Sequence, residues 1–261
     1  MKVKVIGSGS MWNEYNSASY LIDKKTMIDF PNGTCKNLFR LNINPNTVED
    51  IVLTHFHGDH YFDIPFYYLL KSKYKLLDVN IYCGKEGKRK INKLLKLAFP
   101  NSTKELLKTL NIKYNNSDTF KLKNYSVERV EVEHGKMTAY GYIFNEKDKY
   151  VGFTGDTKLC ESVEYMSSIC DYLFCDCMFL EGTEKHMGID NLKLLSEKYP
   201  NCTYIVSHME VSTREKLKEL NIKNIIVPED GEEIIILIRE IGFFILYLYL
   251  ISSLSQIQLK I

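Results

Sequence analysis

The chain has 261 residues, enough to bury a sizeable core as one large domain or as two small ones. Hydrophobic residues make up 45% and charged residues 26%, which is ordinary for a globular protein. The formal net charge of +1 excludes an overall field that would attract nucleic acid or an anionic membrane, although it leaves room for a local basic patch.

The N-terminal segment 1–7 has too short an apolar run for a secretory signal, and its alternation of Lys and Val predicts a half-buried strand. Seven scattered cysteines, an odd number without C-x-x-C spacing, indicate reduced thiols and a cytoplasmic protein. Cys175-Asp176-Cys177 ends an apolar run, so core packing is favoured there over metal binding.

Apolar runs of about five residues alternate with longer amphipathic stretches, and no repeat, low-complexity segment or linker interrupts them. The expected strands are Ala18–Ile22, Thr26–Asp29, Asp50–Leu53, Val79–Cys83, Ser126–Glu133, Tyr140–Phe144, Tyr150–Thr154, Tyr172–Cys175, Thr203–Ser207 and Ile225–Val227. The expected helices are Gly58–Leu70, Glu86–Phe99, Asn191–Lys198 and Thr213–Glu219. Hairpin-like pairs early and β-α alternation later predict an α/β fold with two mixed sheets packed together and helices outside.

The segment 85–96 is rich in lysine and interleaves its basic residues with Ile91, Leu94 and Leu95. This pattern predicts an amphipathic helix with a solvated basic face. A phosphate-contacting surface is the alternative.

A last strand is expected at Glu232–Leu237, which ends a domain of residues 1–237. The extension 238–261 contains the apolar run 241–254, whose 14 uncharged residues fall short of the ~20 that span a bilayer. We therefore expect no transmembrane span. A docked helix, a homodimer contact or a peripheral membrane contact all fit the run, and packing on protein is favoured.

The segment Thr54–His60 carries three histidines and an aspartate in the pattern H-x-H-x-D-H, directly after an apolar strand. In extended backbone His55 and His57 leave the same face. Gly58 permits a tight bend, after which the last two side chains of the motif can point to a second centre: Asp59 and His60. Imidazole and carboxylate suit zinc, with manganese or iron as alternatives. The non-functional alternative is an exposed His-rich loop that binds no metal.

Three later apolar strands also end in metal-ligand residue types. The run at 126–134 ends in His134, the run at 150–156 ends in a glycine turn and Asp156, and the run at 203–208 ends in His208. Four such strand ends can gather at one site. Five of the six histidines are thereby assigned, and the sixth, His186, lies in a loop-like stretch where it is either an incidental surface residue or a catalytic one.

The motif and the order of the later ligands resemble the metallo-β-lactamase superfamily over roughly residues 1–237. Further landmarks are Ser8–Ser10, Ser19–Asp23, Ile28–Gly33, Gly155–Thr157 and Pro228–Gly231. The resemblance implies a four-layer αβ/βα sandwich with two metal ions at one edge. It implies that one metal is held by His55, His57 and His134, the other by Asp59, His60 and His208, and that Asp156 bridges them.

Two divalent cations that share a carboxylate would also share a water and lower its pKa toward ~7, which gives a hydroxide nucleophile. Asp59 can both bind metal and orient that nucleophile. The leaving alkoxide needs a proton. In the phosphodiesterase and tRNA 3′-processing branches a histidine between the bridging aspartate and the last histidine is thought to supply it, and the resemblance carries this role to His186.

The branches of the superfamily differ at particular positions. Flavo-diiron proteins resemble H-x-E-x-D, whereas His57 stands at the second position here and favours hydrolysis. The β-lactamases are usually exported and often lack the bridging aspartate. The tRNA maturases insert an arm before that aspartate, but His134 and Asp156 are only 22 positions apart.

A phosphodiesterase acting on a small or single-stranded substrate, such as a cyclic nucleotide or cyclic phosphate, is therefore our first expectation. The alternatives are a carboxyl-ester, lactone or thioester hydrolase and a ribonuclease Z-like endonuclease without the arm. A metal- or nucleotide-binding protein without turnover is the non-enzymatic alternative.

Overall fold

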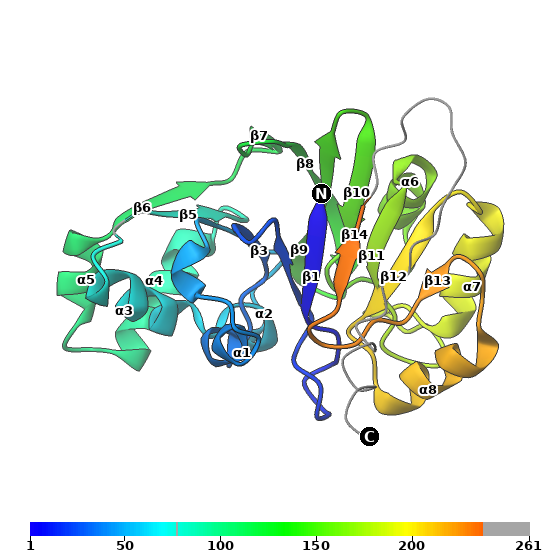
Figure 1. The fold of residues 1–261 in the computed structure, drawn as a ribbon, viewed down its shortest axis with the longest axis horizontal. Helices are drawn as coiled ribbons and strands as arrows, with labels where there is room; N and C mark the ends of the chain where they lie inside the picture. The colour runs from blue at the N-terminus through cyan, green and yellow to red at the C-terminus, as the bar shows by residue number, and fades with distance from the viewer. Residues whose placement is uncertain (77, 237–261) are drawn as a thin grey trace, which may run out of the picture.

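Two seven-stranded sheets pack face to face in the computed structural model, which describes residues 1–76 and 78–236. The first sheet has the order β14-β1-β2-β3-β4-β5-β6 and the second β13-β12-β11-β10-β9-β8-β7. Helices α1–α5 lie beside the first sheet and α6–α8 beside the second, so helices form the outer layers (Figure 1). This arrangement is the predicted αβ/βα sandwich.

The strands of the first sheet are β1 (Lys2–Gly7), β2 (Ser19–Ile22), β3 (Thr26–Ile28), β4 (Asp50–Val52), β5 (Asp78–Tyr82), β6 (Asn111–Asn115) and β14 (Glu233–Ile235). Those of the second are β7 (Thr119–Lys121), β8 (Ser126–His134), β9 (Met137–Glu146), β10 (Lys149–Phe153), β11 (Tyr172–Asp176), β12 (Thr203–Ser207) and β13 (Ile225–Ile226). The helices are α1 (Thr34–Arg40), α2 (Gly58–Tyr61), α3 (Ile64–Lys73), α4 (Gly87–Ala98), α5 (Thr103–Thr109), α6 (Glu161–Ile169), α7 (Ile189–Lys198) and α8 (Val211–Leu220), with a 3₁₀ turn at Pro45–Thr47.

Each sheet is antiparallel in one part and parallel in the other. Strands β3 to β6 run parallel, and so do β10 to β13. Because parallel strands end at the same edge, the residues that follow β4, β10 and β12 come out at neighbouring points of the sandwich. Two bonds join the sheets near that edge: the Tyr142 hydroxyl donates to the Leu53 carbonyl at 2.9 Å, and the Tyr140 amide donates to the Thr54 carbonyl at 3.0 Å.

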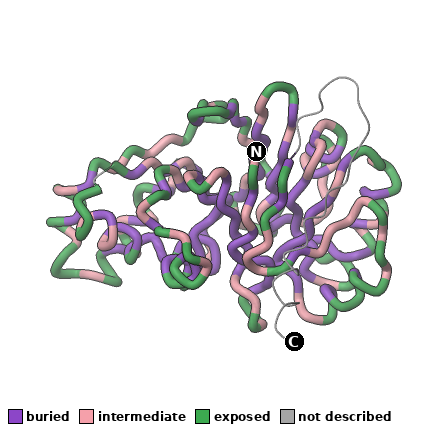
Figure 2. The backbone as a smooth tube through the Cα atoms, viewed as in Figure 1, coloured by how far each residue is buried: buried purple, intermediate pink, exposed green. Residues whose placement is uncertain are grey.

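The buried backbone concentrates in the strands and the inner faces of the helices (Figure 2). One apolar cluster fills the space between the sheets and includes Val5, Ile28, Phe153 and Phe174. Two further clusters join each sheet to its own helices. The strands therefore need apolar side chains on both faces, which explains why many read as continuous hydrophobic runs.

The expected helix Gly58–Leu70 is wrong, because the chain forms two helices there. Pro65 stands in the first turn of α3, where its missing N–H is tolerated, but it cannot continue a helix that began before it. The Asp63 carboxylate accepts a hydrogen bond from the Cys35 amide at 2.7 Å, so this break also ties α3 to α1. Three short helices were not predicted: α1, α5 and α6.

The lysine-rich segment forms α4, whose Ile91 and Leu95 are buried while its lysines face outward, as predicted. All seven cysteines are free. Strand β14 is shorter than the expected Glu232–Leu237, and the predicted extension 238–261 lies outside the described residues. Within residues 1–76 and 78–236, no helix has the length and apolar character to cross a bilayer.

Candidate metal centre

Three imidazoles from the two sheets converge on one point. His55 and His57 follow β4, and His134 ends β8. The His57 Nδ1 atom lies 3.0 Å from His55 Nε2 and 3.1 Å from His134 Nε2. We call these three residues the first ligand group.

A second convergence lies beside it, with carboxylates among the imidazoles. The Oδ2 atom of Asp156 lies 3.2 Å from His60 Nε2 and 3.3 Å from His208 Nε2. The Oδ2 atom of Asp59 lies 3.5 Å from the same atom of His208. We call Asp59, His60, Asp156 and His208 the second ligand group, and all four are buried.

Asp156 connects the two groups, since its Oδ2 atom also lies 3.8 Å from His55 Nε2. The structure thus brings together all seven residues that the sequence singled out as ligands. Gly155, which precedes Asp156, has a φ of 62°, and a Cβ there would lie 2.7 Å from Thr54. A glycine is therefore required for this turn to approach the motif.

The spacing of these atoms fits a cation. Ligands of a tetrahedral zinc ion, at bond lengths near 2.0–2.1 Å, lie roughly 3.3 Å apart. The nitrogen and oxygen pairs within each group have separations close to this value. Two buried atoms of the second group, Asp59 Oδ1 and His60 Nε2, have no hydrogen-bond partner, which is costly unless they have another role. These residues fit a dinuclear centre of zinc or a similar divalent metal.

The outer nitrogens of the imidazoles are held by specific acceptors. The His60 Nδ1–H donates to Asp29 at 2.7 Å, and the His134 Nδ1–H donates to the Lys185 carbonyl at 2.9 Å. The Thr54 hydroxyl donates to Asp29 at 2.7 Å and lies 3.1 Å from His55 Nδ1. Each contact fixes a proton on Nδ1, so Nε2 is the nitrogen directed at the cluster.

The two groups differ in their electrostatics. Burial lowers the pKa of His55 well below its usual value and also lowers the pKa values of His57 and His134. Burial acts the same way on His60, but Asp156 and Asp29 outweigh it and raise the pKa. For His208, too, burial is outweighed, chiefly by Asp156, and the pKa rises to about 9.

The carboxylates of the second group show the complementary effect. Burial tends to raise the pKa of Asp156, but His208 and His60 hold it well below its usual value. Without a cation, protons on these two histidines therefore balance the buried negative charge. A metal ion would replace those protons.

The backbone is unusual at His208, which has a φ of 59° immediately after β12. Asp29, which follows β3 and supports His60, also has a positive φ, 56°. Non-glycine residues in this region are uncommon, and Asp and His are among the types that adopt it more readily. Here the left-handed turn redirects each side chain from its strand end into the cluster.

Gly58 has a different role from the one predicted. It begins α2 and is not among the residues with positive φ, so the chain does not need glycine for the bend itself. A Cβ at this position would lie 2.7 Å from the Phe62 ring. A side chain at position 58 would therefore displace the Phe62 ring, which packs against the motif.

His186 lies beside both ligand groups. Its ring stacks on His208, with a centroid separation of 5.1 Å and an interplanar angle of 16°, and its centroid is 4.8 Å from that of His134. The Nδ1–H donates to Asp176 at 2.8 Å, and the side chain is 13% exposed. This placement excludes the reading of His186 as an incidental surface residue.

Asp176 and Asp29 are the site residues that the sequence interpretation missed. Asp176 ends β11, between the strands that lead to Asp156 and His208, and its Oδ2 also accepts from the Thr157 amide at 3.0 Å. Burial raises the pKa of Asp176, and the hydrogen bond from His186 opposes this rise. Its neighbours Cys175 and Cys177 are core residues, as predicted. Its position at a strand end was the signal that could have identified it.

A second set of ligand atoms overlaps with these groups: Asp156, Asp176, His186 and His208. The Asp176–His186 hydrogen bond occupies the Nδ1 of that histidine. In this arrangement that nitrogen is therefore not free to bind a metal ion.

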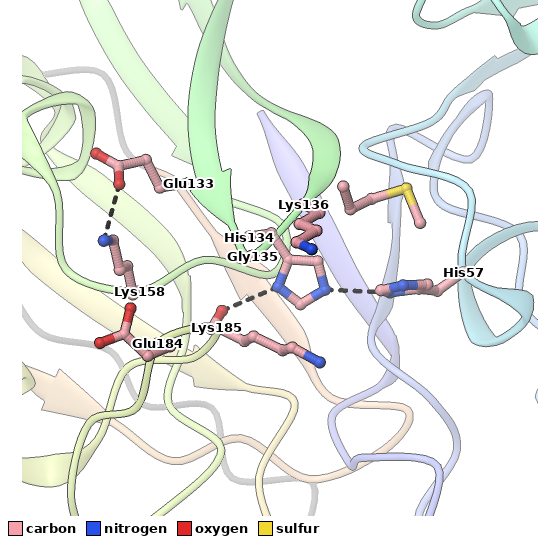
Figure 3. A pocket seen from close by; sticks show the side chains of 9 residues that line it. His57, Glu133, His134, Gly135, Lys136, Lys158, Glu184 and Lys185 are labelled. Atoms are coloured by element: carbon pink, nitrogen blue, oxygen red, sulfur yellow. Dashed lines mark hydrogen bonds and ion pairs between the residues drawn. The ribbon is translucent and has the colours of Figure 1, made fainter.

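Two cavities open on the site. One, of about 610 Å³, is lined by residues of both ligand groups and by His186. The other, of about 640 Å³, reaches His57 and His134 from the side, with Lys136 and Lys185 on either side of the His134 ring (Figure 3). In the same cavity Lys158 is paired with Glu133 at 2.9 Å.

Two solved structures share the fold over most of the chain. A diphosphatase of the PhnP family superposes with a TM-score of 0.72 at 20% identity, covering 90% of this chain and 97% of that one. The metallo-β-lactamase fold protein YhfI from Bacillus subtilis also gives 0.72, at 16% identity, covering 89% and 97%. The fold is therefore that of the metallo-β-lactamases, as the sequence predicted.

One curated relative is similar to this chain in sequence. Ribonuclease Z of Pyrococcus horikoshii is 33% identical over 129 residues, which are 49% of this chain and 40% of that protein. The chain thus matches less than half of the length of this relative. The prediction of a metal-dependent hydrolase is in line with this ribonuclease relative.

One family model spans nearly all of the described chain. The model of the anti-Pycsar protein Apyc1 matches residues 1–226, which include every ligand residue discussed above. On this match, the protein belongs to the Apyc1 family within the metallo-β-lactamase fold.

Proposed function

We propose that this protein is a dinuclear metal-dependent phosphodiesterase acting on a small or single-stranded substrate. The observation that carries the proposal is the Asp176–His186 pair beside the two ligand groups. Ester hydrolysis at phosphorus needs a proton for the leaving alkoxide, and a buried carboxylate that fixes an imidazole next to the reaction centre provides one.

The ligand residues support the first half of the reaction. Two divalent metal ions, when bound, would supply an activated water and neutralise charge on the phosphate oxygens. The Oδ1 atom of Asp59 is buried without a hydrogen-bond partner, so this carboxylate can both bind metal and orient the attacking water. Burial alone would raise the pKa of Asp59, but the hydrogen bond with His208 and the charge of His60 lower it, which favours the ionised form that binds metal.

His186 supports the second half. Its Nδ1–H is committed to Asp176, which leaves Nε2 as the nitrogen that can hold the transferable proton. As the water oxygen bonds to phosphorus, the bond from phosphorus to the leaving oxygen breaks, and that oxygen takes the proton from Nε2. The Asp176 carboxylate stabilises the imidazolium before the transfer. Asp176 is thus a positioning residue for His186.

The surroundings favour an anionic and small substrate. Lys185 lines both cavities and adds positive charge next to His134. Strands β9 and β10 occupy the chain between His134 and Asp156, so no inserted arm is present there to bind a folded RNA. We place the protein in the cytosol, on the basis of its free thiols. A homodimer remains a prediction.

The test compares substrates on the zinc-loaded protein: a 3′,5′-cyclic nucleotide, a chromogenic phosphodiester, a thioester and a β-lactam. We expect the phosphodiesters to be cleaved fastest. His186→Ala should slow hydrolysis of the cyclic nucleotide by about 10²–10⁴-fold. Hydrolysis of a diester with a good leaving group should slow far less. Glu197→Gln, on the exposed side of α7, is the matched control.

The alternative is a carboxyl-ester, lactone or thioester hydrolase, for which the same activated water would attack carbonyl carbon. Preferential cleavage of the thioester, with little effect of His186→Ala, would favour that alternative. Full metal loading with no turnover of any substrate in the panel would favour a binding protein.

A further inference from the structure

The backbone turn that carries the ligand His208 is held by a loop outside the metal centre. His208 has a φ of 59°, and a non-glycine residue keeps this left-handed conformation only when the surrounding contacts favour it. The next residue, Met209, has both of its backbone groups bonded to the loop that connects β1 to β2. Its amide donates to the Ser8 carbonyl at 3.3 Å, and its carbonyl accepts from the Ser10 amide at 3.1 Å and the Asn13 side chain at 2.8 Å.

The same loop contacts the segment after His208 at further points. Gly9 pairs with Met209 in an isolated parallel bridge, and a Cβ on Gly9 would lie 2.5 Å from the Tyr15 side chain. The Ser10 hydroxyl donates to Glu210 at 2.5 Å. Because these contacts are close and numerous, a displaced loop would take the turn at His208 with it.

Asp230, in the turn between β13 and β14, holds this loop at two places. Its Oδ1 atom accepts from the Ser8 amide at 2.9 Å and from the Ser8 hydroxyl at 2.8 Å. Its Oδ2 atom accepts from the Asn16 amide and from the Asn16 side chain, both at 2.8 Å. Hydrogen bonds to an ionised carboxylate are stronger than neutral ones, so this one side chain fixes the path of the loop from Ser8 to Asn16.

Arg214 of α8 supports the loop from another side. It is buried, and its guanidinium donates to the Ser8 hydroxyl at 2.5 Å and to the Pro228 carbonyl at 2.7 Å. The guanidinium also lies 4.0 Å from the centre of the Tyr15 ring. The Ser8 hydroxyl therefore joins the buried cation to the Asp230 carboxylate. Burying a charge is costly, and the cost falls when its contacts with the loop are kept.

We propose that Asp230 and Arg214 are positioning residues for the ligand His208, and that they set the metal affinity of the second ligand group through the loop between β1 and β2. Neither residue belongs to a ligand group or lines either cavity described above. Without their support the left-handed turn would relax and move the His208 imidazole away from the second group. The inference goes beyond the proposed function, because it concerns the metal centre whichever substrate the protein cleaves.

The main test removes the carboxylate that holds the loop. Asp230→Ala should weaken zinc binding by the second group about tenfold or more and leave the affinity of the first group nearly unchanged. Calorimetric titration of the metal-free protein with zinc measures both affinities. The titration step that is lost in His208→Ala identifies the second group. Asp230→Asn retains one acceptor oxygen and should recover part of the affinity.

A matched control separates this role from a general loss of stability. Asp171 also accepts from a lysine and from a backbone amide, namely Lys149 at 2.5 Å and Tyr150 at 3.0 Å, but it lies just before β11, at the end of that strand away from the ligands. Asp171→Ala should lower the melting temperature of the metal-free protein, as Asp230→Ala does, and leave both zinc affinities unchanged. Absorption of the cobalt-substituted protein, which reports coordination geometry, should change only in Asp230→Ala.

A second variant tests the contact with Met209 directly. Asn13→Asp keeps the size of the side chain but replaces the amide donor with an oxygen that faces the Met209 carbonyl. It should weaken zinc binding by the second group about tenfold. Arg214→Lys, which keeps the charge but not the planar set of donors, should act in the same direction.

The proposal is overturned if Asp230→Ala binds zinc in the second group as tightly as the original protein. It is also overturned if both ligand groups lose affinity equally, or if Asp171→Ala weakens the second group as much as Asp230→Ala. Should Asp230→Ala not fold, Asn13→Asp and Arg214→Lys decide by the same criteria. Zinc binding is measured without substrate, so a failure of the phosphodiesterase assignment would leave these outcomes unaffected.

Discussion

The two ligand groups lie side by side but differ in charge, burial and support. The first consists of three imidazoles whose pKa values are lowered by burial, and His57 remains partly exposed. Its outer hydrogen bonds go to a backbone carbonyl and a hydroxyl. The second is fully buried, contains two carboxylates and is supported by a third carboxylate, Asp29.

The two ligand groups therefore favour metal binding for two different reasons. The first group presents neutral lone pairs, so a metal ion meets little competition from protons near neutral pH. The second group supplies negative charge, but its histidines hold protons that a metal ion must displace.

The largest expected effect comes from the residue that the two groups share. Asp156→Ala should remove metal from both groups and lower activity by on the order of 10³-fold or more. Metal analysis of the purified variant, together with the phosphodiester assay, checks this. Asp118→Ala serves as the control, because the Asp118 side chain is 85% exposed and belongs to neither ligand group. If only one metal is lost, Asp156 belongs to the second group alone.

Removing the support of the second group should act on that group selectively. Asp29→Ala leaves the His60 Nδ1–H and the Thr54 amide without their acceptor. We expect metal affinity of the second group to fall by about 10–100-fold. Titration with a chelator on Asp29→Ala and on Asp29→Asn, which retains an acceptor oxygen, measures the effect. Equal weakening of metal binding in both groups would show that Asp29 does not support the second group alone.

The pH dependence should also differ between the groups. The pKa of His208 in the folded protein, about 9, lies above its unfolded value of about 6.5. Protonation of His208 therefore stabilises the metal-free fold below pH 6.5, and this contribution is lost as the pH rises through 9.

Metal binding by the second group should become stronger as the pH rises, because protons on its histidines must leave before the metal ion can bind. Affinity of the second group should rise about tenfold per pH unit between pH 7 and 8 for each proton that the metal displaces, while that of the first group stays nearly constant. Chelator competition at the two pH values checks this, with the melting temperature of the metal-free protein as a second measurement. Two identical slopes would show that the groups do not titrate separately.

The smallest expected effect concerns the support of the first group. Thr54→Val removes the hydroxyl next to His55 Nδ1 and should cost about 1 kcal/mol, a few-fold in metal affinity. Asp29 loses one donor but keeps the Thr54 amide and His60, so the second group should change less. Calorimetric titration with zinc resolves the two steps. A larger loss in the second group would mean that the Thr54–Asp29 bond, rather than the His55 contact, matters most.

Much of this site could be predicted from the sequence. The motif at Thr54–His60 and the strand ends at His134, Asp156 and His208 were identifiable because strand periodicity places a ligand type directly after each apolar run. The sandwich of two mixed sheets followed from the same alternation of runs. Local patterns sufficed because each depends on residues adjacent in the chain.

Only the tertiary structure decided the rest. Asp29 and Asp176 lie far from the motif in sequence, and their role depends on which strands are neighbours. The loop between β1 and β2 is tied to Met209, next to the ligand residue His208, by the Asn13 side chain. Such contacts join distant segments, so no periodicity of one segment encodes them. The sequence determined which residues can bind metal, and the packing of the two sheets decided which atoms support them and what can lie beside them.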